Sequence, residues 1–134
     1  MNNKTNQNTQ LTVIIPVTER YDPVTELYYE YKRGIDATGL TYEIIYVLDG
    51  DHPDVLEELE KLQESEKLSN ITLAKIFGEA TALTAAFSKA SGDAFLTLPA
   101  YQQIDTNEIP KLVAAIKDND MALSRRWPRR DSMM

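Results

Sequence analysis

Residues 11–16 read LTVIIP, and residues 42–50 read YEIIYVLDG. Both are apolar runs of strand length, and neither shows the polar alternation of a strand with one solvated face. Near-continuous apolar strands are typical of a parallel sheet that helices cover on both faces. The two runs therefore predict buried strands, the first ending at Pro16 and the second at Leu48.

The segments outside these runs alternate between helical and strand patterns. Between the two runs, apolar residues recur at helical spacing, and Gly34 or Gly39 closes that segment. Pro53 suits the first turn of a second helix. The apolar positions expected to face the core in these two helices are Val24, Leu27, Tyr28, Tyr31, Ile35, Val55, Leu56, Leu59 and Leu62.

The second half of the chain continues the alternation. A third strand is predicted over 71–76 and a fourth over 94–98, with a helix between them that presents Leu83, Ala86, Phe87 and Ala90. Gly92 is expected at the C′ position of that helix. Another helix follows near Asn107, with Pro110 in its first turn, and residues 120–124 suit a fifth short strand.

Strands alternating with helices predict an α/β fold, a three-layer and mainly parallel sheet with helices on both faces. We expect a single domain over residues 11–134, preceded by a polar, Asn-rich lead-in over 1–10 that stays disordered. That lead-in does not resemble a signal peptide. No apolar stretch approaches the roughly 18 residues of a membrane-spanning helix. A cytoplasmic location, including the cytoplasmic face of the membrane, is therefore the expectation.

The charge of the chain excludes some functions. A net charge of −7 argues against nucleic-acid binding, which needs a basic face. The chain has no cysteine, so it has neither a disulfide framework nor a thiolate metal site. Four arginines lie close together near the end of the sequence: Arg125, Arg126, Arg129 and Arg130. They are either a solvated tail or a local phosphate-binding patch, since arginine suits bidentate phosphate contacts.

Ligands of open α/β sheets collect at the carboxyl ends of the strands. The candidate segments are therefore 16–20, 49–51, 77–79, 99–103 and 124–126. Neither G-x-G-x-x-G nor G-x-x-x-x-G-K-[ST] is present, so a dinucleotide dehydrogenase or a P-loop NTPase is not indicated. His52 is the only histidine and is best interpreted as a turn or helix-start residue, which argues against a catalytic triad.

An ordered set of motifs resembles family-2 glycosyltransferases of the dolichol-phosphate mannosyltransferase type. Residues 42–50 are similar to that family's YEIIFVDDGS, and residues 92–98, GDAFLTL, to its GDYVVTLDAD. The opening strand also matches, as do FGEATALTAA at 77–86, NEIPKL at 107–112 and SRRWPRRDS at 124–132. The resemblance runs from about residue 11 to 132 and implies the N-terminal half of a Rossmann-like nucleotide-diphospho-sugar transferase domain, of the GT-A type.

The resemblance also implies site residues. Asp49 matches the second acid of the family's DDG turn, which contacts the base, whereas Leu48 replaces the first. The nucleotide-binding positions carried over are Pro16, Thr18, Glu19, Asp49, Gly50 and Gly78. Arg126 matches a phosphate-binding arginine. The implied ligand is a UDP- or GDP-sugar, bound weakly or no longer bound.

One departure concerns the metal. Family members hold Mg²⁺ or Mn²⁺ with Asp-x-Asp, but Pro99 and Tyr101 stand at those positions. Hard cations need oxygen ligands such as carboxylates, so no metal cofactor is expected in this chain. A second departure is Glu79, which replaces a basic residue and reverses the charge where phosphates are expected.

Three interpretations stay open. The first is a glycosyltransferase-like domain with little or no activity, whose intact relatives transfer a sugar to a polyprenyl phosphate or glycan acceptor, in some cases at a membrane. The second is a regulatory or scaffold domain that kept the fold. The third is an unrelated flavodoxin-like or receiver-like domain, which accounts for the alternation but not for the motifs. An apolar patch left without its partner would favour a homo-oligomer.

Overall fold

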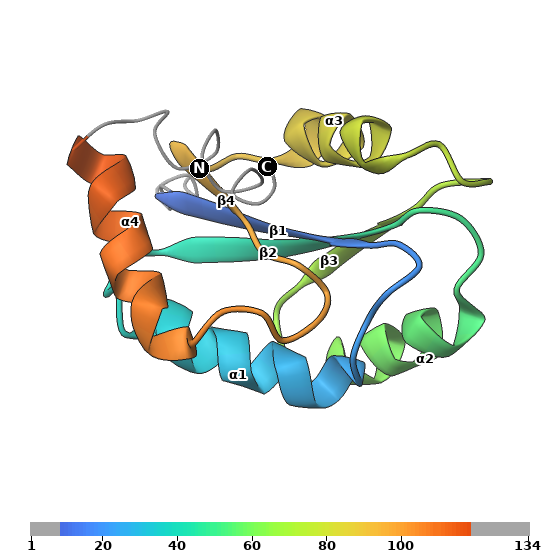
Figure 1. Ribbon diagram of the computed structural model, residues 1–134, viewed down its shortest axis with the longest axis horizontal. Coiled ribbons are helices and arrows are strands. Elements are labelled where there is room, and N and C mark those ends of the chain that lie inside the picture. Colours follow the sequence, from blue (N-terminus) through green and yellow to red (C-terminus); the bar gives the residue numbers. More distant parts are fainter. Residues whose placement is uncertain (1–8, 119–134) are drawn as a thin grey trace, which may run out of the picture.

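Four parallel strands form one sheet in the order β3-β2-β1-β4 (Figure 1). The computed structural model describes residues 9–118. The strands are β1 (Leu11–Val17), β2 (Tyr42–Leu48), β3 (Ser69–Thr72) and β4 (Ala94–Thr97). Every strand pair is parallel, which confirms the predicted sheet. The predicted fifth strand and the arginine cluster lie outside the described residues.

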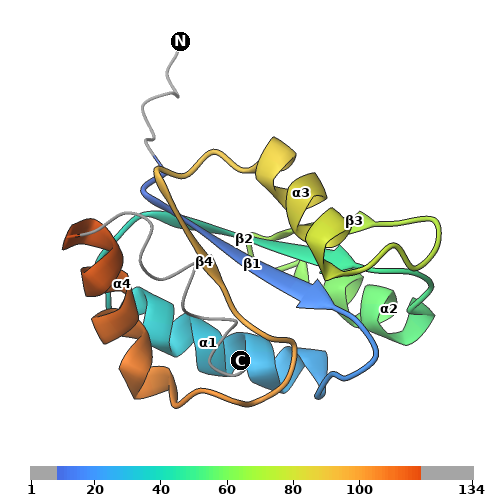
Figure 2. The same cartoon turned by 45° about the horizontal axis from the view of Figure 1, so that its top comes forward.

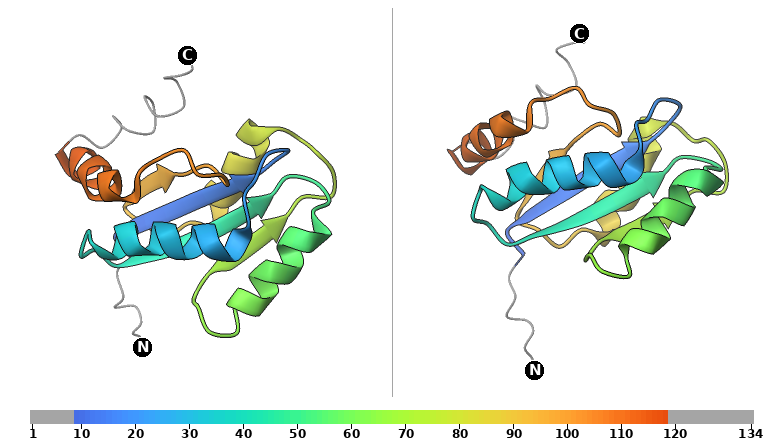
Figure 3. Two further views of the ribbon diagram at one scale, coloured as in Figure 1. Left: turned by 60° about the horizontal axis from the view of Figure 1, so that its bottom comes forward. Right: turned by 90° about the horizontal axis from the view of Figure 1, so that it is seen from below.

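Helices cover both faces of the sheet (Figures 1 and 3). They are α1 (Val24–Asp36), α2 (Pro53–Leu62), α3 (Glu79–Lys89) and α4 (Ile109–Asp118), with the short 3-10 helix η2 (Thr106–Glu108) leading into α4. α1, α2 and α4 pack on one face, and α3 lies across β1 and β2 on the other (Figure 2). This arrangement is the predicted three-layer α/β fold.

The sheet separates two hydrophobic cores. The larger lies against α1, α2 and α4 and contains Tyr28 and Tyr31, which are both fully buried as predicted. The smaller is formed by Ile14, Ile45 and Val47 of the sheet with Ala82 and Ala86 of α3. All seven residues of β1 are buried, as expected for a central strand covered on both faces.

The third strand differs from its predicted position. It was expected over 71–76, but β3 is an edge strand that pairs only with residues 45–48 of β2. The position of β3 is therefore determined by its pairing with the end of β2 and not by the apolar residues of β3 itself. The chain leaves the sheet after Leu73, whose N–H donates to the Leu48 carbonyl at 2.9 Å, and Ile76 is 71% exposed.

The end of α3 also differs from the prediction. Gly92 does not terminate the helix in a left-handed conformation, because α3 ends at Lys89 and Ala90 is extended. Gly92 lies instead against β1, where an added Cβ would be 2.5 Å from the Thr12 hydroxyl oxygen. Phe87, expected to face the core, is 44% exposed and packs on Phe95. The buried residues of α3 are the small Ala82 and Ala86, because this helix lies close to the sheet.

Gly34 allows α1 and η2 to approach each other. The helix continues through Gly34 to Asp36, and the turn beyond it contains Gly39 at φ 76°. A Cβ on Gly34 would lie 2.6 Å from the Thr106 carbonyl oxygen and 2.8 Å from Ile109 Cδ1. Only glycine fits this helix crossing without movement of the backbone.

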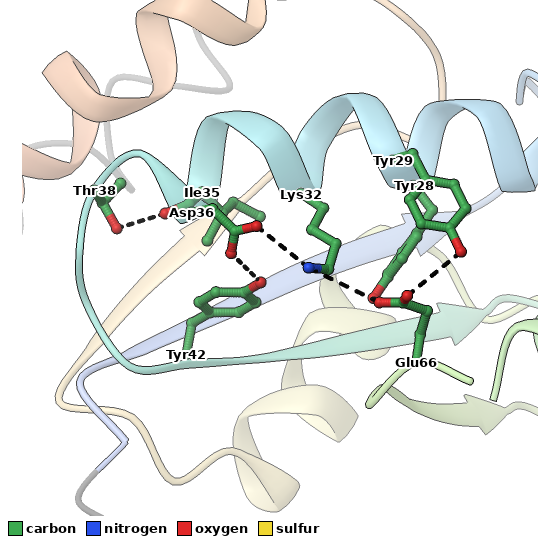
Figure 4. Close-up of polar contacts among 8 residues, drawn as sticks. All are labelled: Tyr28, Tyr29, Lys32, Ile35, Asp36, Thr38, Tyr42 and Glu66. Carbon is green, nitrogen blue, oxygen red and sulfur yellow. Dashed lines mark hydrogen bonds and ion pairs between the residues drawn. The ribbon is translucent and has the colours of Figure 1, made fainter. Parts of the chain in front are cut away.

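A polar network ties α1 to two segments at the amino-terminal edge of the sheet (Figure 4). Tyr28 donates to Glu66 at 2.9 Å, and Tyr42 donates to Asp36 at 2.6 Å. Lys32 lies between the two carboxylates, 3.2 Å from Asp36 and 4.0 Å from Glu66. Burial, followed by the bond to Glu66, raises the pKa of Tyr28. The bond from Tyr42 lowers the pKa of Asp36.

Within residues 9–118, no helix is both long and apolar enough to cross a membrane.

Substituting Gly34→Ala is expected to destabilise the fold. At an open helix position this change stabilises by roughly 0.5 to 1 kcal/mol. Here the added methyl group would clash with Thr106 and Ile109, so we expect the substitution to lower the free energy of unfolding by roughly 1 to 3 kcal/mol. Urea unfolding measures the difference, and Thr81→Ala on the exposed face of α3 is the control for ordinary helix propensity. A more stable Gly34→Ala variant would contradict the close packing of α1 on η2.

The free energy of unfolding should fall as the pH rises above about 10, the ordinary pKa of tyrosine. Below that pH, Tyr28 is protonated in both the folded and the unfolded chain, so its full contribution is present. Above it, the unfolded chain releases the proton while the folded chain keeps it, which favours unfolding. Urea unfolding at a series of alkaline pH values should show a shallower decline for Tyr28→Phe. An unchanged slope in that variant would exclude Tyr28 as a source of the effect.

Candidate functional site

The carboxyl ends of the strands bring together most of the predicted site segments. β1 is paired with β2 as far as Val17↔Leu48, but with β4 only as far as Ile14↔Thr97. The Ile14 carbonyl accepts from the N–H of Leu98, the residue just after β4, and residues two apart on a strand face the same neighbour. Pro16 therefore faces β4, and it has no N–H to extend the ladder. The sheet divides at this point, between the central strand β1 and the edge strand β4.

Asp49 fixes the loop that follows β3. Its carboxylate is 3% exposed and accepts two backbone hydrogen bonds, Oδ1 from the Phe77 N–H at 2.8 Å and Oδ2 from the Gly78 N–H at 3.0 Å. We call this arrangement the Asp49 clasp. The Asp49 N–H donates in turn to the Val17 carbonyl at 3.0 Å. The end of β1, the end of β2 and the start of α3 are thus held together through one residue.

Two glycines of the site need the conformations that glycine permits. Gly50 has φ 103°, and a Cβ there would lie 2.7 Å from Ile76 Cγ1. Gly78 has φ 104° and precedes the first turn of α3, where Glu79 is exposed. Both glycines lie beside the Asp49 clasp. Gly50 is buried beneath Ile76, whereas a Cβ on Gly78 would meet nothing within 4 Å, so it is at Gly78 that the backbone is open to close approach by a ligand.

The loop between β1 and α1 carries the polar residues predicted for nucleotide contact. Thr18 is half-buried and Glu19 is exposed. Arg20 is also exposed, and its guanidinium carbon lies 4.0 Å from the centre of the Tyr101 ring. This contact links the loop after β1 to the loop after β4, and the sequence reasoning did not foresee it.

The segment after β4 is held through its backbone. The Tyr31 hydroxyl donates to the Pro99 carbonyl at 2.7 Å and lies 3.2 Å from the Tyr101 carbonyl. Asp22 donates its N–H to the Ala100 carbonyl at 2.8 Å, and its carboxylate accepts from the Gln102 N–H at 2.6 Å. Burial, with Asp22 nearby, raises the pKa of Tyr31. The tyrosine therefore stays protonated and donates to this loop.

These residues do not suit a divalent metal. Pro99 and Ala100 offer no side-chain oxygen, and the Pro99 and Tyr101 carbonyls already accept from Tyr31. The Arg20 cation over Tyr101 would repel a second cation. No group of three or more histidine or acidic residues suited to a metal occurs in the described part of the chain.

A groove beside the site is acidic. Its volume is about 570 Å³, and it is lined by Asp22, Pro23, Glu26, Leu27, Glu30 and Gln102. Of these residues, Gln102 alone belongs to a predicted site segment. Three carboxylates on its walls make it a poor place for the phosphates of a nucleotide. We therefore define the candidate site by the chemistry of the predicted residues and not by the volume of this groove.

The structure thus brings Asp49, Gly50 and Gly78 together, and places Pro16 on the adjoining strand. Arg126 lies outside the described residues. His52 is the residue before α2, as predicted, with its ring edge-on to Tyr21 and Nε2 3.3 Å from the Asp49 carbonyl oxygen. Arg20 lies within the predicted segment 16–20, but the sequence reasoning gave it no role and did not foresee its contact with Tyr101.

Comparison with known families gives one match across most of the chain. The profile described as Glycosyl transferase family 2 matches residues 12–132. A curated relative, undecaprenyl-phosphate 4-deoxy-4-formamido-L-arabinose transferase of Klebsiella pneumoniae, is 32% identical over 127 residues. The alignment covers 92% of this chain and 39% of the relative. The chain therefore spans about two fifths of that relative's length.

Solved structures support the same fold. The crystal structure of S. aureus TarS 1–349 has a TM-score of 0.58 and 20% identity, covering 83% of this chain and 33% of that chain. The mannosyltransferase PcManGT from Pyrobaculum calidifontis, solved in complex with GDP-Man and Mn²⁺, has a TM-score of 0.61 and 16% identity, covering 84% of this chain and 33% of that one. At these identities the likeness concerns the fold alone.

Substituting Asp49→Ala should loosen the loop before α3. The Phe77 and Gly78 N–H groups would lose their acceptors, at a cost of roughly 1 to 3 kcal/mol in the free energy of unfolding. Faster hydrogen exchange at these two amides should accompany the loss. Asp51→Ala removes an exposed acid from the same turn and is the matched control for charge. If the two substitutions changed the free energy of unfolding and the hydrogen exchange equally, the Asp49 clasp would make no specific contribution to the stability of this loop.

Proposed function

The chain belongs to glycosyl transferase family 2, and on that premise we propose that it is the nucleotide-binding part of a glycosyltransferase-like protein. Its ligand class is a UDP- or GDP-sugar. The acceptor of the whole protein is a polyprenyl phosphate or a glycan, and transfer by this chain itself is poor or absent. Support for the acceptor class comes from the name of the curated relative, which is an undecaprenyl-phosphate transferase.

The Asp49 clasp carries the proposal. It places a buried carboxylate and two glycine backbones at the carboxyl edge of the sheet, where ligands of such folds bind. Pro16, Thr18 and Glu19 form the neighbouring side of the same site, and Asp49, Gly50 and Gly78 the other. Arg126 is assigned to the phosphates on resemblance alone, since it lies outside the described residues.

Loss of the metal is the second part of the proposal. Pro99 and Tyr101 stand where the resemblance implies a pair of metal-binding carboxylates. A divalent cation stabilises charge that develops on a leaving diphosphate. Without that contribution a domain can still bind a nucleotide, but it transfers the sugar slowly. We therefore assign this chain to binding rather than to metal-dependent turnover.

A regulatory or scaffold function is the alternative. The observation that favours it is the use of both Asp49 oxygens by backbone N–H groups of the same chain. An acid that fixes a loop would be kept even in a domain that no longer binds a ligand. This alternative places the partner surface elsewhere and expects no nucleotide affinity.

Calorimetry of the full chain with UDP, GDP and their sugars tests the proposal. We expect binding that is the same with and without Mn²⁺, and no sugar transfer to a polyprenyl phosphate. Affinity that appears only with Mn²⁺, or turnover by this chain, would contradict the loss of metal chemistry.

The scaffold alternative is separated by melting temperature. A bound nucleotide raises the melting temperature by mass action. The parent chain and Asp51→Ala should show this rise, and Asp49→Ala should lose it. If no nucleotide raises the melting temperature of the parent chain, the binding proposal fails and the scaffold function stands.

A further inference from the structure

We propose that Arg20, held over the ring of Tyr101, is a binding site for the diphosphate group of the nucleotide. This assignment rests on the proposed function, which it deepens by naming a cation that acts without a metal. The proposal concerns an arginine that lies in the loop after β1, whereas the phosphate contacts that the sequence suggested all lie within residues 125–130.

The stacked position leaves the arginine able to bind an anion. The guanidinium carbon is 4.0 Å from the ring centre, within the range of a favourable cation–π contact. Arg20 is exposed, and its guanidinium N–H groups have no hydrogen-bond acceptor among the described residues that would compete with a ligand. Those N–H groups match the oxygens of a phosphate in a bidentate geometry.

The backbone that carries the Tyr101 ring is held in place by its neighbours. The Tyr31 hydroxyl of α1 contacts the Pro99 and Tyr101 carbonyls, and Asp22 bonds the backbone at Ala100 and Gln102. The Asp22 bonds join the loop after β1 to the loop after β4, and the Tyr31 bonds join the loop after β4 to α1. Preorganisation of this kind lowers the cost of ordering a flexible side chain when a ligand binds.

The charge of Arg20 is not neutralised within the described residues. No carboxylate of residues 9–118 forms an ion pair with it, while the nearby Asp22 carboxylate accepts from the Gln102 N–H. Arg33 provides a contrast, because it pairs with Glu30 at 2.8 Å. An unpaired arginine at the point where the sheet divides is suited to an anionic ligand.

The position in the fold agrees with this chemistry. Arg20 follows β1 and Tyr101 follows β4, and these are the two strands whose pairing stops at Ile14↔Thr97. Ligands of open α/β sheets bind outside the strand ends at such a switch of strand order. Apart from the four arginines within residues 125–130, the chain is strongly acidic, so few other segments suit a small anion.

Calorimetric titration of the full chain with UDP, inorganic pyrophosphate and uridine, all in EDTA, tests the assignment. Arg20→Ala should weaken binding of UDP and pyrophosphate about tenfold, as expected for the loss of a charged hydrogen bond. Binding of uridine should not change. Arg33→Ala is the matched control, because it removes the same charge from an exposed site on α1 and should leave all three affinities unaltered. Tyr101→Leu should cause part of the Arg20→Ala loss, and Tyr101→Phe, which keeps the ring, should cause none.

The outcomes separate this assignment from the proposed function. If pyrophosphate binding depends on Arg20 but neither UDP nor uridine binds, the anion site stands and the nucleotide function fails. If UDP binds equally to the parent and to Arg20→Ala, the nucleotide function stands and Arg20 is not the diphosphate contact. Absence of pyrophosphate binding to the parent chain, or equal losses in Arg20→Ala and Arg33→Ala, overturns the assignment.

Discussion

Burial of β1 on both faces is the constraint on which the rest of the structure depends. One face of the strand joins the core that α1, α2 and α4 cover, α3 packs on the other face, and β2 and β4 pair with its two edges. An apolar strand with no exposed face can only be satisfied in this central position. Its two edges are nevertheless unequal, because Pro16 withholds the N–H that would continue the pairing with β4. The same strand that organises the core therefore also sets where the sheet divides and where a ligand can approach.

Local pattern was enough to predict the elements that interact mainly with the core. β1, β2, α1 and α2 begin or end within a residue or two of their predicted bounds, because unbroken apolar runs and helical spacing report directly on burial. β3 was displaced because an edge strand takes its register from its neighbour. The role of Gly92 was predicted wrongly. Glycine is needed there because the backbone passes close to Thr12, which is 80 residues away in the chain. Sequence spacing carries no record of such distant contacts.

The candidate site shows the same limit more sharply. Asp49 was recognised as important from its place after β2, but its bonds to Phe77 and Gly78 depend on how the loop after β3 returns to the sheet. For Tyr101, the sequence indicated only that it stands where the resemblance implies a carboxylate. Its contact with Arg20 could not be inferred, because it depends on the register of β1 against β4 and on the Asp22 and Tyr31 bonds that fix both loops. The sequence shows which side chain a position lacks. The contacts that the side chain present there makes can be seen only in the folded structure.

Under the proposed function, Tyr101 replaces a metal-binding carboxylate and Arg20 from the loop after β1 lies over its ring, and this difference has a definite chemical consequence. A metal site attracts a diphosphate through a divalent charge that also strengthens its contact as the leaving group becomes more negative. A single exposed guanidinium attracts the same diphosphate, but it binds the ground state and the transition state with similar strength. Uniform binding of this kind raises affinity without lowering the barrier of the chemical step. In the function proposed here, nucleotide binding without efficient sugar transfer would follow from one difference at the end of β4 and would not require two separate explanations.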